Sequence, residues 1–441
     1  MARRLDASDP GFEAAFEALI AARHVEADVA GDVAAIIDDV KSRGDAAVID
    51  YTGRFDRLSV GHVAELRVTE DEIAAARAEC GADTIAALEL AHQRIRDYHQ
   101  RLMPRAFEHT DAAGIRLGAR WTPVAAAGLY VPGGTASYPS SVLMNAVPAR
   151  VAGVGRIVMT APAPDGMLSP LVLAAAALAG IDEIWRIGGA QAIAALAHGT
   201  QTIRPVDKIV GPGNAYVAEA KRQVFGTVGI DMIAGPSEVL IVADGANDPA
   251  WIAADLLAQA EHDVLAQAIA MTDDSEFADA VADAVAAHLE TLPRAAIAGA
   301  SWRDHGAIIV LARLADAVPL IDRLAPEHLE LACSDAEAET LAAMVRNAGA
   351  IFLGRHAPEA IGDYVAGPNH VLPTAGSARF SSGLGVGDFL KRTSIIGCGP
   401  EGLAAIGPAA AVLADAEGLD AHALSVRLRL AAAANDGRDG A

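Results

Sequence analysis

Two adjacent side chains, Glu327 and His328, combine a carboxylate with an imidazole in the string Ala325-Pro-Glu-His-Leu-Glu-Leu331. The two groups have different ordinary pKa values, and a reaction with several proton transfers needs acid/base groups of that kind. Pro326 has no backbone N–H, so it predicts the start or an interruption of a local element. The pair is therefore a candidate for acid/base catalysis. The alternative is an exposed polar dipeptide at the start of a helix.

A second group of side chains could bind a metal ion. Gln259 and His262 are three residues apart in a segment that we expect to be helical, and residues at this spacing share one helix face. Imidazole is a good zinc ligand, and an amide oxygen is a weak but possible one. The alternative for this pair is an ordinary helix surface. Asp363, in Ile361-Gly-Asp-Tyr364, adds a carboxylate.

Two further segments carry histidines. Gly367-Pro-Asn-His-Val-Leu-Pro-Thr374 is rich in turn residues, which predicts a loop that lines a site, with His370 either a ligand or a structural residue. Glu417 and His422 belong to a short amphipathic tail with little core of its own. Such a tail usually docks on another surface, and a second subunit is one candidate.

Three glycine turns follow expected strands, at Val131-Pro-Gly-Gly134, Ile187-Gly-Gly-Ala190 and Gly211-Pro-Gly-Asn214. Glycine lets a ligand approach the backbone, and the helix N-termini beyond such turns attract phosphate. The GxGxxG dinucleotide fingerprint is absent, because its nearest match, Gly153-Val-Gly155, has Val158 in place of the third glycine. The turns therefore indicate either a nucleotide-binding crevice or ordinary strand-to-helix connections.

The elements that must position these residues begin with a helical region, including Val29–Arg43 and Glu70–Leu102, which ends at the apolar run Val124–Tyr130. Two series of strand, turn and helix follow, which predicts βαβ units and parallel sheets with right-handed crossovers. The expected strands are Ile157–Ala161, Glu183–Ile187, Lys208–Val210, Val239–Ala243, Ala268–Thr272, Ala307–Leu311 and Ala350–Leu353. The expected helices are Ser140–Val151, Pro170–Leu178, Ala190–Ala197, Trp251–His262, Phe277–Leu292, Asp335–Arg346 and a tail from Ala410, which a glycine-rich segment, Gly376–Gly387, precedes.

Length and composition bound the class of protein. The chain has 441 residues, more than a single core usually supports, so two or more domains are expected. A formal net charge of −23 argues against nucleic acid and anionic membrane surfaces as partners. The longest apolar stretch, near Leu168–Ile181, is too short to span a bilayer, and the N-terminus shows no signal-peptide pattern. The three cysteines form no CxxC pair, so we expect a cytoplasmic location and metal ligands other than cysteine.

Collectively these strings resemble the histidinol dehydrogenase family, in the same order and at family-like spacing from the N-terminal helices almost to the C-terminus. The strings that carry the resemblance are Tyr130-Val-Pro-Gly-Gly-Thr-Ala-Ser-Tyr138-Pro-Ser-Ser-Val-Leu-Met-Asn-Ala-Val-Pro148, Gly211-Pro-Gly-Asn214, Ala234-Gly-Pro-Ser237-Glu-Val-Leu240, Gln259-Ala-Glu-His262, Pro326-Glu-His328-Leu-Glu-Leu331, Gly362-Asp-Tyr364, Gly367-Pro-Asn-His370-Val-Leu-Pro373 and Glu417-Gly-Leu-Asp-Ala-His422. Long strings of this kind rarely arise by chance, so they outweigh the ordinary alternatives for the single motifs.

The resemblance implies an α/β fold with two incomplete Rossmann-like parallel-sheet domains plus small helical terminal segments, in an intertwined homodimer. The implied segments are 1–24 (helical, packing with the tail), 25–129 with 237–384 (a first α/β domain that carries zinc and the catalytic residues), 130–236 (a second α/β domain that binds NAD) and 385–441 (segments that cross to the partner subunit).

The activity that the resemblance implies is the NAD-dependent four-electron oxidation of L-histidinol to L-histidine through L-histidinaldehyde, the last steps of histidine biosynthesis. One Zn²⁺ per subunit would be held by Gln259, His262 and Asp363 of one subunit and His422 of the other. Zinc then acts mainly as a template that anchors the substrate's imidazole and amine.

The resemblance also assigns residues to substrate, cofactor and catalysis. The substrate-binding positions are Ser237, Gln259, His262, Glu327, His328, Asp363, Glu417 and His422, and the NAD-binding positions are Tyr130, Gln191 and Asn214. Our hypothesis for the chemistry is that His328 takes protons in both oxidations, while Glu327 activates the water that hydrates the aldehyde.

Two other functions compete with this one. A relative with the same fold could oxidise another small alcohol, such as a sulfonated propanediol. Glu417 and His422 match the region that recognises imidazole, which favours histidinol. A non-catalytic, zinc-stabilised nucleotide-binding protein would bind NAD without turnover, and the intact Glu327-His328 pair argues against it.

Overall fold

The structure, a computed structural model, describes the chain except residues 1, 24–27, 134–137, 182, 234 and 437–441, and in 433–436 only the backbone is described. It divides into two compact units: unit 1 comprises Met1–Leu102 and Val124–Phe389, and unit 2 comprises Met103–Pro123 and Leu390–Ala441. Several of the quoted sequence features extend beyond the described residues: Gly134 of the first glycine turn, Ala234 and the expected boundary at 24 and 25.

Unit 1 contains a six-stranded sheet in which every pair of neighbouring strands is parallel. In spatial order its strands are β1 (Arg3–Asp6), β11 (Ala307–Val310), β10 (Gln267–Thr272), β9 (Glu238–Ala243), β12 (His328–Ala332) and β13 (Ala350–Leu353). The side chains of β9 alternate between two hydrophobic cores, with Leu240 and Val242 in one and Val239 and Ile241 in the other. This alternation follows from the two-residue period of a strand that is buried on both faces.

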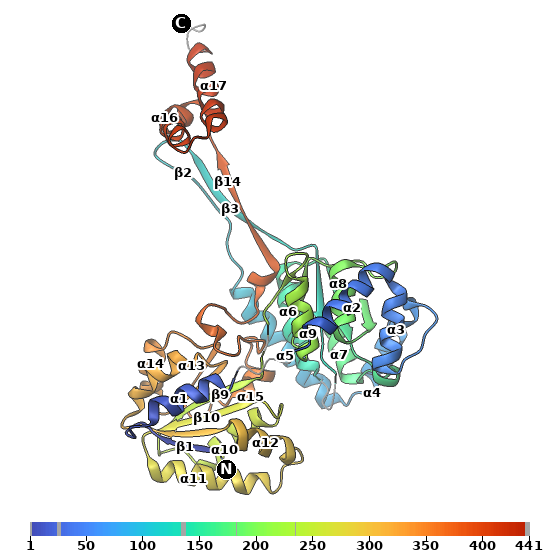
Figure 1. The fold of residues 1–441 in the computed structure, drawn as a ribbon, viewed down its shortest axis with the longest axis vertical. Coiled ribbons are helices and arrows are strands. Elements are labelled where there is room, and N and C mark those ends of the chain that lie inside the picture. Colours follow the sequence, from blue (N-terminus) through green and yellow to red (C-terminus); the bar gives the residue numbers. More distant parts are fainter. Residues whose placement is uncertain (1, 24–27, 134–137, 182, 234, 437–441) are drawn as a thin grey trace. The chain divides into compact units, whose positions relative to one another are not determined.

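Helices cover both faces of this sheet (Figure 1). On one face lie α1 (Phe12–Ala21), α13 (Ala317–Leu324) and α14 (Asp335–Met344), and on the other lie α10 (Pro249–Ala260), α11 (Ser275–Leu289) and α12 (Ala295–His305). The short helix α15 (Glu359–Tyr364) follows β13 and contacts α10. The last turn of α10 and the helix α15 therefore lie close to each other.

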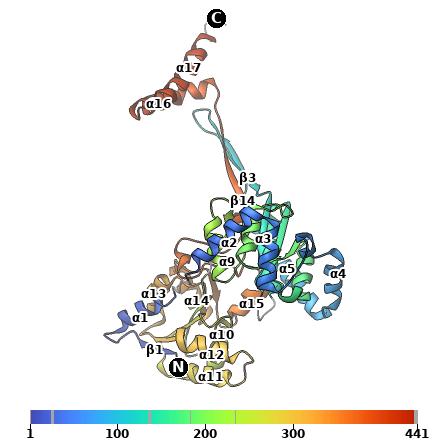
Figure 2. The same ribbon diagram turned by 45° about the vertical axis from the view of Figure 1, so that its right-hand side comes forward.

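A second, five-stranded parallel sheet lies in the same unit. Its strands, in spatial order, are β6 (Glu183–Arg186), β5 (Arg156–Ala161), β4 (Ala126–Tyr130), β7 (Lys208–Val210) and β8 (Gly229–Ile230). Chain order reverses between β4 and β7, the arrangement that leaves a crevice at the carboxyl ends of these two strands. The helices around it are α2 (Ala30–Arg43), α3 (Asp45–Asp56), α4 (Glu70–Glu79), α5 (Ala82–Arg101), α6 (Pro139–Ala152), α7 (Pro170–Leu178), α8 (Gly189–His198) and α9 (Ala215–Val224). Figure 2 shows α2 beside α3 and α9.

Unit 2 consists of a three-stranded antiparallel sheet and two helices that pack on each other. Its elements are β2 (Phe107–Thr110), β3 (Arg116–Pro123), β14 (Leu390–Gly397), α16 (Pro400–Ala416) and α17 (Asp420–Asp436). Gly407 lies where the helices meet, and a Cβ there would come within 3.3 Å of side-chain atoms of Val426 and Leu430. The five short 3₁₀ helices of the described chain are η1 (Val63–Leu66), η2 (Pro164–Gly166), η3 (Leu314–Asp316), η4 (Ser377–Arg379) and η5 (Val386–Phe389).

The predicted α/β class is confirmed, and every strand expected after Val124 is present within one or two residues of its expected ends. β1, β2, β3, β8, β12 and β14 were not predicted, and β2 and β3 lie in the region that was expected to be helical. The sequence of β1, Arg-Arg-Leu-Asp, is too short and polar to show strand periodicity, and β12 carries Glu and His in a buried strand. The expected helix Glu70–Leu102 is two helices, α4 and α5, separated at Cys80 and Gly81.

The N-terminal segments pack on both parallel sheets of unit 1. α2 and α3 share a hydrophobic core with the five-stranded sheet, and the predicted domain that joins 25–129 to 237–384 stays a prediction. In the segment 1–24, β1 lies at the edge of the six-stranded sheet, and Phe16 and Leu19 of α1 are buried in that sheet's core. The packing of this segment with the tail stays a prediction. No helix of the described residues is long and apolar enough to cross a membrane. Cys80, Cys333 and Cys398 are free.

Candidate active site at the amino edge of the six-stranded sheet

The Glu327-His328 pair lies at the amino-terminal edge of the six-stranded sheet. His328 is the first residue of β12 and pairs in register with Val239 of the neighbouring strand β9. Both Glu327 and His328 are buried, so the alternative of an exposed dipeptide at a helix start is wrong. The helices that return from the carboxyl edge end beside this edge, which brings in the end of α10, with Gln259, and α15, with Asp363.

The His328 imidazole is held in one tautomer by the backbone of β9. Its Nδ1 lies 3.0 Å from the carbonyl oxygen of Glu238, and because a carbonyl only accepts, Nδ1 carries the hydrogen and Nε2 the lone pair. Burial lowers the pKa of His328 to about 4, against the smaller opposing effect of the Asp363 carboxylate. At neutral pH the ring is therefore uncharged, with Nε2 free to accept a proton.

Glu327 is a buried carboxyl with one backbone donor. Its Oε2 accepts the N–H of Glu238 at 2.9 Å and lies 3.7 Å from Nδ1 of His328. Burial raises the pKa of Glu327 well above its ordinary value, and the carboxylates of Glu238 and Asp363 raise it further. A carboxylate whose pKa is raised in this way is a stronger base when ionised, as general-base catalysis near neutral pH requires.

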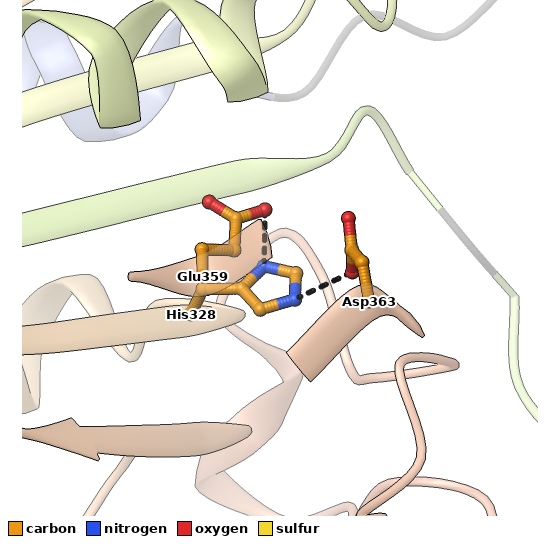
Figure 3. Close-up of side chains that lie close together, drawn as sticks. All are labelled: His328, Glu359 and Asp363. Atoms are coloured by element: carbon orange, nitrogen blue, oxygen red, sulfur yellow. Dashed lines mark ion pairs between the residues drawn. The ribbon is translucent and has the colours of Figure 1, made fainter. Parts of the chain in front are cut away.

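His328 lies between two further carboxyl groups, those of Glu359 and Asp363 (Figure 3). Oε1 of Glu359 is 3.5 Å from Nδ1, and Oδ1 of Asp363 is 4.0 Å from Nε2. One ligand atom from each of the three residues lies within 4.8 Å of the other two, a spacing that a metal ion could bridge. Burial raises the pKa of Glu359 well above its ordinary value.

Gln259 and His262 add nitrogen and oxygen donors at the end of α10. Gln259 is fully buried, its Nε2 is 3.4 Å from Nδ1 of His262, and its Oε1 has no hydrogen-bond partner among the described residues. A positive charge on His262 would lower the pKa of both His328 and His370, so this imidazole lies near theirs. An unsatisfied buried oxygen beside imidazole and carboxylate groups fits the mixed nitrogen and oxygen donor set that zinc accepts.

The loop 367–374 lines a cavity at this edge, as its turn residues predicted. The cavity has a volume of about 270 Å³, and His328, Gly362, Asn369 and His370 are among its lining residues. Nδ1 of His370 lies 3.0 Å from the backbone oxygen of Asp363, so this imidazole donates a hydrogen bond to the backbone of α15. The space is sufficient for a small polar molecule beside the acid/base pair.

The remaining substrate-binding predictions fall in two places. Ser237 is half-buried directly before β9, next to the Glu238 backbone that contacts both Glu327 and His328. Glu417 and His422 belong to unit 2, where both are exposed. Their contribution to the site stays a prediction.

The three predicted NAD-binding residues lie at carboxyl ends of the five-stranded sheet. Tyr130 ends β4, and its hydroxyl accepts the N–H of Gly189 at 3.1 Å. Asn214 follows β7 and caps α9, its Oδ1 accepting the N–H of Val217 at 3.2 Å. Gln191, in the first turn of α8, is buried, and neither polar atom of its side chain has a hydrogen-bond partner within the described chain. These positions surround the point where the strand order reverses.

Two residues of this edge were missed by the sequence analysis. Glu359 faces His328 from α15, and Glu238 contacts Glu327 and His328 through its backbone. A carboxylate directly before the apolar run Val239–Ala243 was the available signal for Glu238, since a charged residue at a buried strand end usually has a partner. No comparable signal marks Glu359.

Comparison with known proteins agrees with this geometry. Residues 21–430 match the family model described as histidinol dehydrogenase. The chain belongs to the histidinol dehydrogenase family.

Relatives of the same family cover nearly the whole chain. A curated histidinol dehydrogenase of Rhodospirillum rubrum is 64% identical over 98% of this chain and 99% of its own length, and one of Bradyrhizobium diazoefficiens is 62% identical over 97% and 99%. The crystal structure of histidinol dehydrogenase from Elizabethkingia anophelis superposes with a TM-score of 0.92, at 36% identity and 98% coverage of both chains. The resemblance inferred from the motifs is therefore confirmed.

Proposed function

We propose that this chain oxidises L-histidinol to L-histidine through L-histidinaldehyde, reducing two NAD, in the last steps of histidine biosynthesis. Membership of the histidinol dehydrogenase family supports the substrate. The observation that carries the chemistry is the pairing of a neutral, buried imidazole at His328 with a carboxyl of raised pKa at Glu327. The family assignment does not favour the competing small-alcohol substrate.

The three chemical steps need two proton acceptors. In the first oxidation, Nε2 of His328 takes the hydroxyl proton while the carbon-bound hydrogen leaves as hydride, which gives the aldehyde. Glu327 then takes a proton from water as the water oxygen adds to the aldehyde carbon, and the protonated His328 returns its proton to the aldehyde oxygen, which gives the diol and leaves His328 neutral again. In the second oxidation, His328 takes a proton from the resulting diol while a second hydride leaves, which gives the carboxylic acid. NAD, when bound, supplies the hydride acceptor in both oxidations.

We propose that zinc is held by Gln259, His262 and Asp363 together with His422 of the partner subunit. The unsatisfied Oε1 of Gln259 and the proximity of Asp363 to His328 support a cation at this edge. The ion would supply a template that fixes the substrate's imidazole and amine. Ser237 and Glu417 would contact the substrate.

The proposed NAD-binding residues are Tyr130, Gln191 and Asn214. Their place around the reversal of strand order, and the unpartnered amide of Gln191, support this assignment. Backbone groups of the glycine turns would then approach the dinucleotide where GxGxxG is absent.

We also propose a homodimer whose subunits share their active sites, with no nucleic acid or membrane partner and a cytoplasmic location. Unit 2 supports the homodimer. Its two helices carry four large apolar side chains that are each more than half exposed, namely those of Val412, Leu413, Leu424 and Leu428. Several large apolar side chains left exposed on one small unit are typical of a surface that another chain covers.

The proposal is tested by following NADH formation from L-histidinol with the zinc-loaded protein. Two NADH and one histidine per histidinol are expected, with activity abolished by a chelator and restored by zinc. Absence of NADH from histidinol, in protein shown to bind both zinc and NAD, would contradict the substrate assignment and lead to a panel of other small alcohols.

A further inference from the structure

We propose that a buried ion pair, Arg23 with Glu238, positions both acid/base residues of the active site. Only the kinetic test of this inference depends on the proposed function. Arg23 lies just after α1, and Glu238 is the first residue of β9, 215 positions further along the chain. Both side chains are about 95% buried, at 3% and 5% exposure.

The guanidinium of Arg23 contacts two segments of the site at once. Its Nε donates to Oε1 of Glu238 at 2.8 Å, and its Nη2 forms a second, short contact to Oε2. Its Nη1 donates to the carbonyl oxygen of Leu324. Leu324 ends α13 and directly precedes the left-handed turn at Ala325 that leads into Pro326 and Glu327. Arg23 therefore links the start of β9 to the turn that presents the catalytic pair.

Glu238 completes the link through its backbone. Its N–H donates to Oε2 of Glu327 at 2.9 Å, and its carbonyl oxygen accepts from Nδ1 of His328 at 3.0 Å. Its side chain also accepts the N–H of Ala375 at 2.8 Å. One residue thus orients both catalytic side chains, and the position of that residue depends on a carboxylate held by Arg23.

Anchoring of the N-terminal segment does not require this ion pair. Phe16 and Leu19 of α1 are already buried in the core, and β1 pairs along its length with β11. A buried ion pair often stabilises a protein no more than apolar side chains of similar volume would. Its location beside Glu327 and His328 is better explained by positioning, because a displacement of about 1 Å at a reacting group can cost about 10²-fold in rate.

The test compares Arg23→Met with a matched control, Arg323→Met. Arg323, in α13, pairs with Glu13 and Glu17 of α1, the helix that precedes Arg23, but lies at the surface. We expect Arg23→Met to lower kcat about 10²-fold in both half-reactions, with a smaller change in the KM for histidinol. The control should keep kcat within about twofold, because exposed ion pairs contribute little. Guanidinium ion added to Arg23→Met should restore part of the lost kcat. The kcat of Arg23→Lys should lie between those of the wild type and Arg23→Met.

A second readout does not depend on turnover. The Nδ1–H signal of His328 in ¹⁵N-labelled protein, assigned with His328→Asn, should shift or broaden in Arg23→Met and remain in place in Arg323→Met. If Arg23→Met misfolds, the double variant Arg23→Met/Glu238→Gln, which leaves no unpaired buried charge, serves in its place. Unchanged kcat per folded molecule and an unchanged His328 signal would overturn the inference. Wild-type protein that produces no NADH would instead overturn the proposed function, and the His328 signal would still decide this one.

Discussion

The division of labour between Glu327 and His328 is open to a direct test by Glu327→Gln. Glutamine keeps the shape of the side chain, and its amide oxygen can accept the same N–H of Glu238 that Oε2 accepts at 2.9 Å. The contact between Nδ1 of His328 and the Glu238 carbonyl does not involve Glu327 and should remain. The substitution therefore removes the ability to take a proton and leaves the geometry of the site in place.

The expected size of the effect follows from that difference. Loss of a general base typically costs about 10²–10⁴-fold, which is about 3–5 kcal/mol of transition-state stabilisation. We expect this loss in aldehyde oxidation, which needs the hydrated aldehyde. Alcohol oxidation depends on His328 and should fall by less than about tenfold. The free energy of unfolding should not decrease, because a neutral amide replaces a carboxyl whose buried charged form is unfavourable.

The assay measures NADH formation separately from L-histidinol and from L-histidinaldehyde. In the variant, the yield from histidinol should fall from two NADH toward one during the first turnovers, as aldehyde remains unoxidised on the enzyme. His328→Asn is the matched comparison and should slow both half-reactions. Equal losses in the two half-reactions of Glu327→Gln would refute the assignment of water activation to Glu327.

Three further perturbations follow from the structure. His422→Asn should weaken zinc binding by at least about tenfold without lowering Tm, and mixing it with Gln259→Ala should restore activity in heterodimers; absence of rescue in proven heterodimers would contradict a shared site. Lys221→Met should raise the KM for NAD about tenfold with zinc content unchanged. Nζ of Lys221 donates to the carbonyl oxygen of Gly211 at 3.0 Å, and its buried partner Asp231 accepts the N–H of Gly211 at 2.7 Å, so the pair holds the glycine turn beside the proposed NAD site. An unchanged KM would show that this turn does not belong to the NAD site. Asp255→Asn should stabilise the protein increasingly between pH 4 and 6, by up to about 3 kcal/mol. Burial raises the pKa of Asp255 from 3.8 to about 6, so the wild type loses stability as pH rises from the unfolded-state pKa of 3.8 to about 6 and no further above that. A Tm difference independent of pH would show that the carboxyl titrates normally.

Local sequence predicted the elements that carry the site. Runs such as Val239–Ala243 and Ala268–Met271 are apolar at every position, and a strand buried on both faces requires that pattern. Strings such as Gln259-Ala-Glu-His262 and Pro326-Glu-His328 predicted the family, which the comparisons confirmed. The residue types suited to proton transfer and metal binding were therefore visible without coordinates.

The sequence was less informative where polar residues enter the core. β12 was not predicted as a strand, because His328 and Glu330 interrupt its apolar pattern. Their burial depends on partners from other segments: the Glu238 backbone faces His328, and Glu330 accepts the N–H of Glu359. Hydrophobic periodicity contains no information about such partners, since they are distant in the chain.

What the sequence determined by itself is the inventory: which segments are apolar enough to form a doubly covered parallel sheet, and which side chains could do the chemistry. What only the tertiary structure decided is the environment of those side chains. Parallel crossovers bring the starts of β9 and β12 together, although 90 residues separate Glu238 from His328. Burial at that edge then lowers the pKa of His328 and raises that of Glu327. Both shifts come from exclusion of water, which depends on the packing of the whole unit and not on neighbouring residues in the sequence.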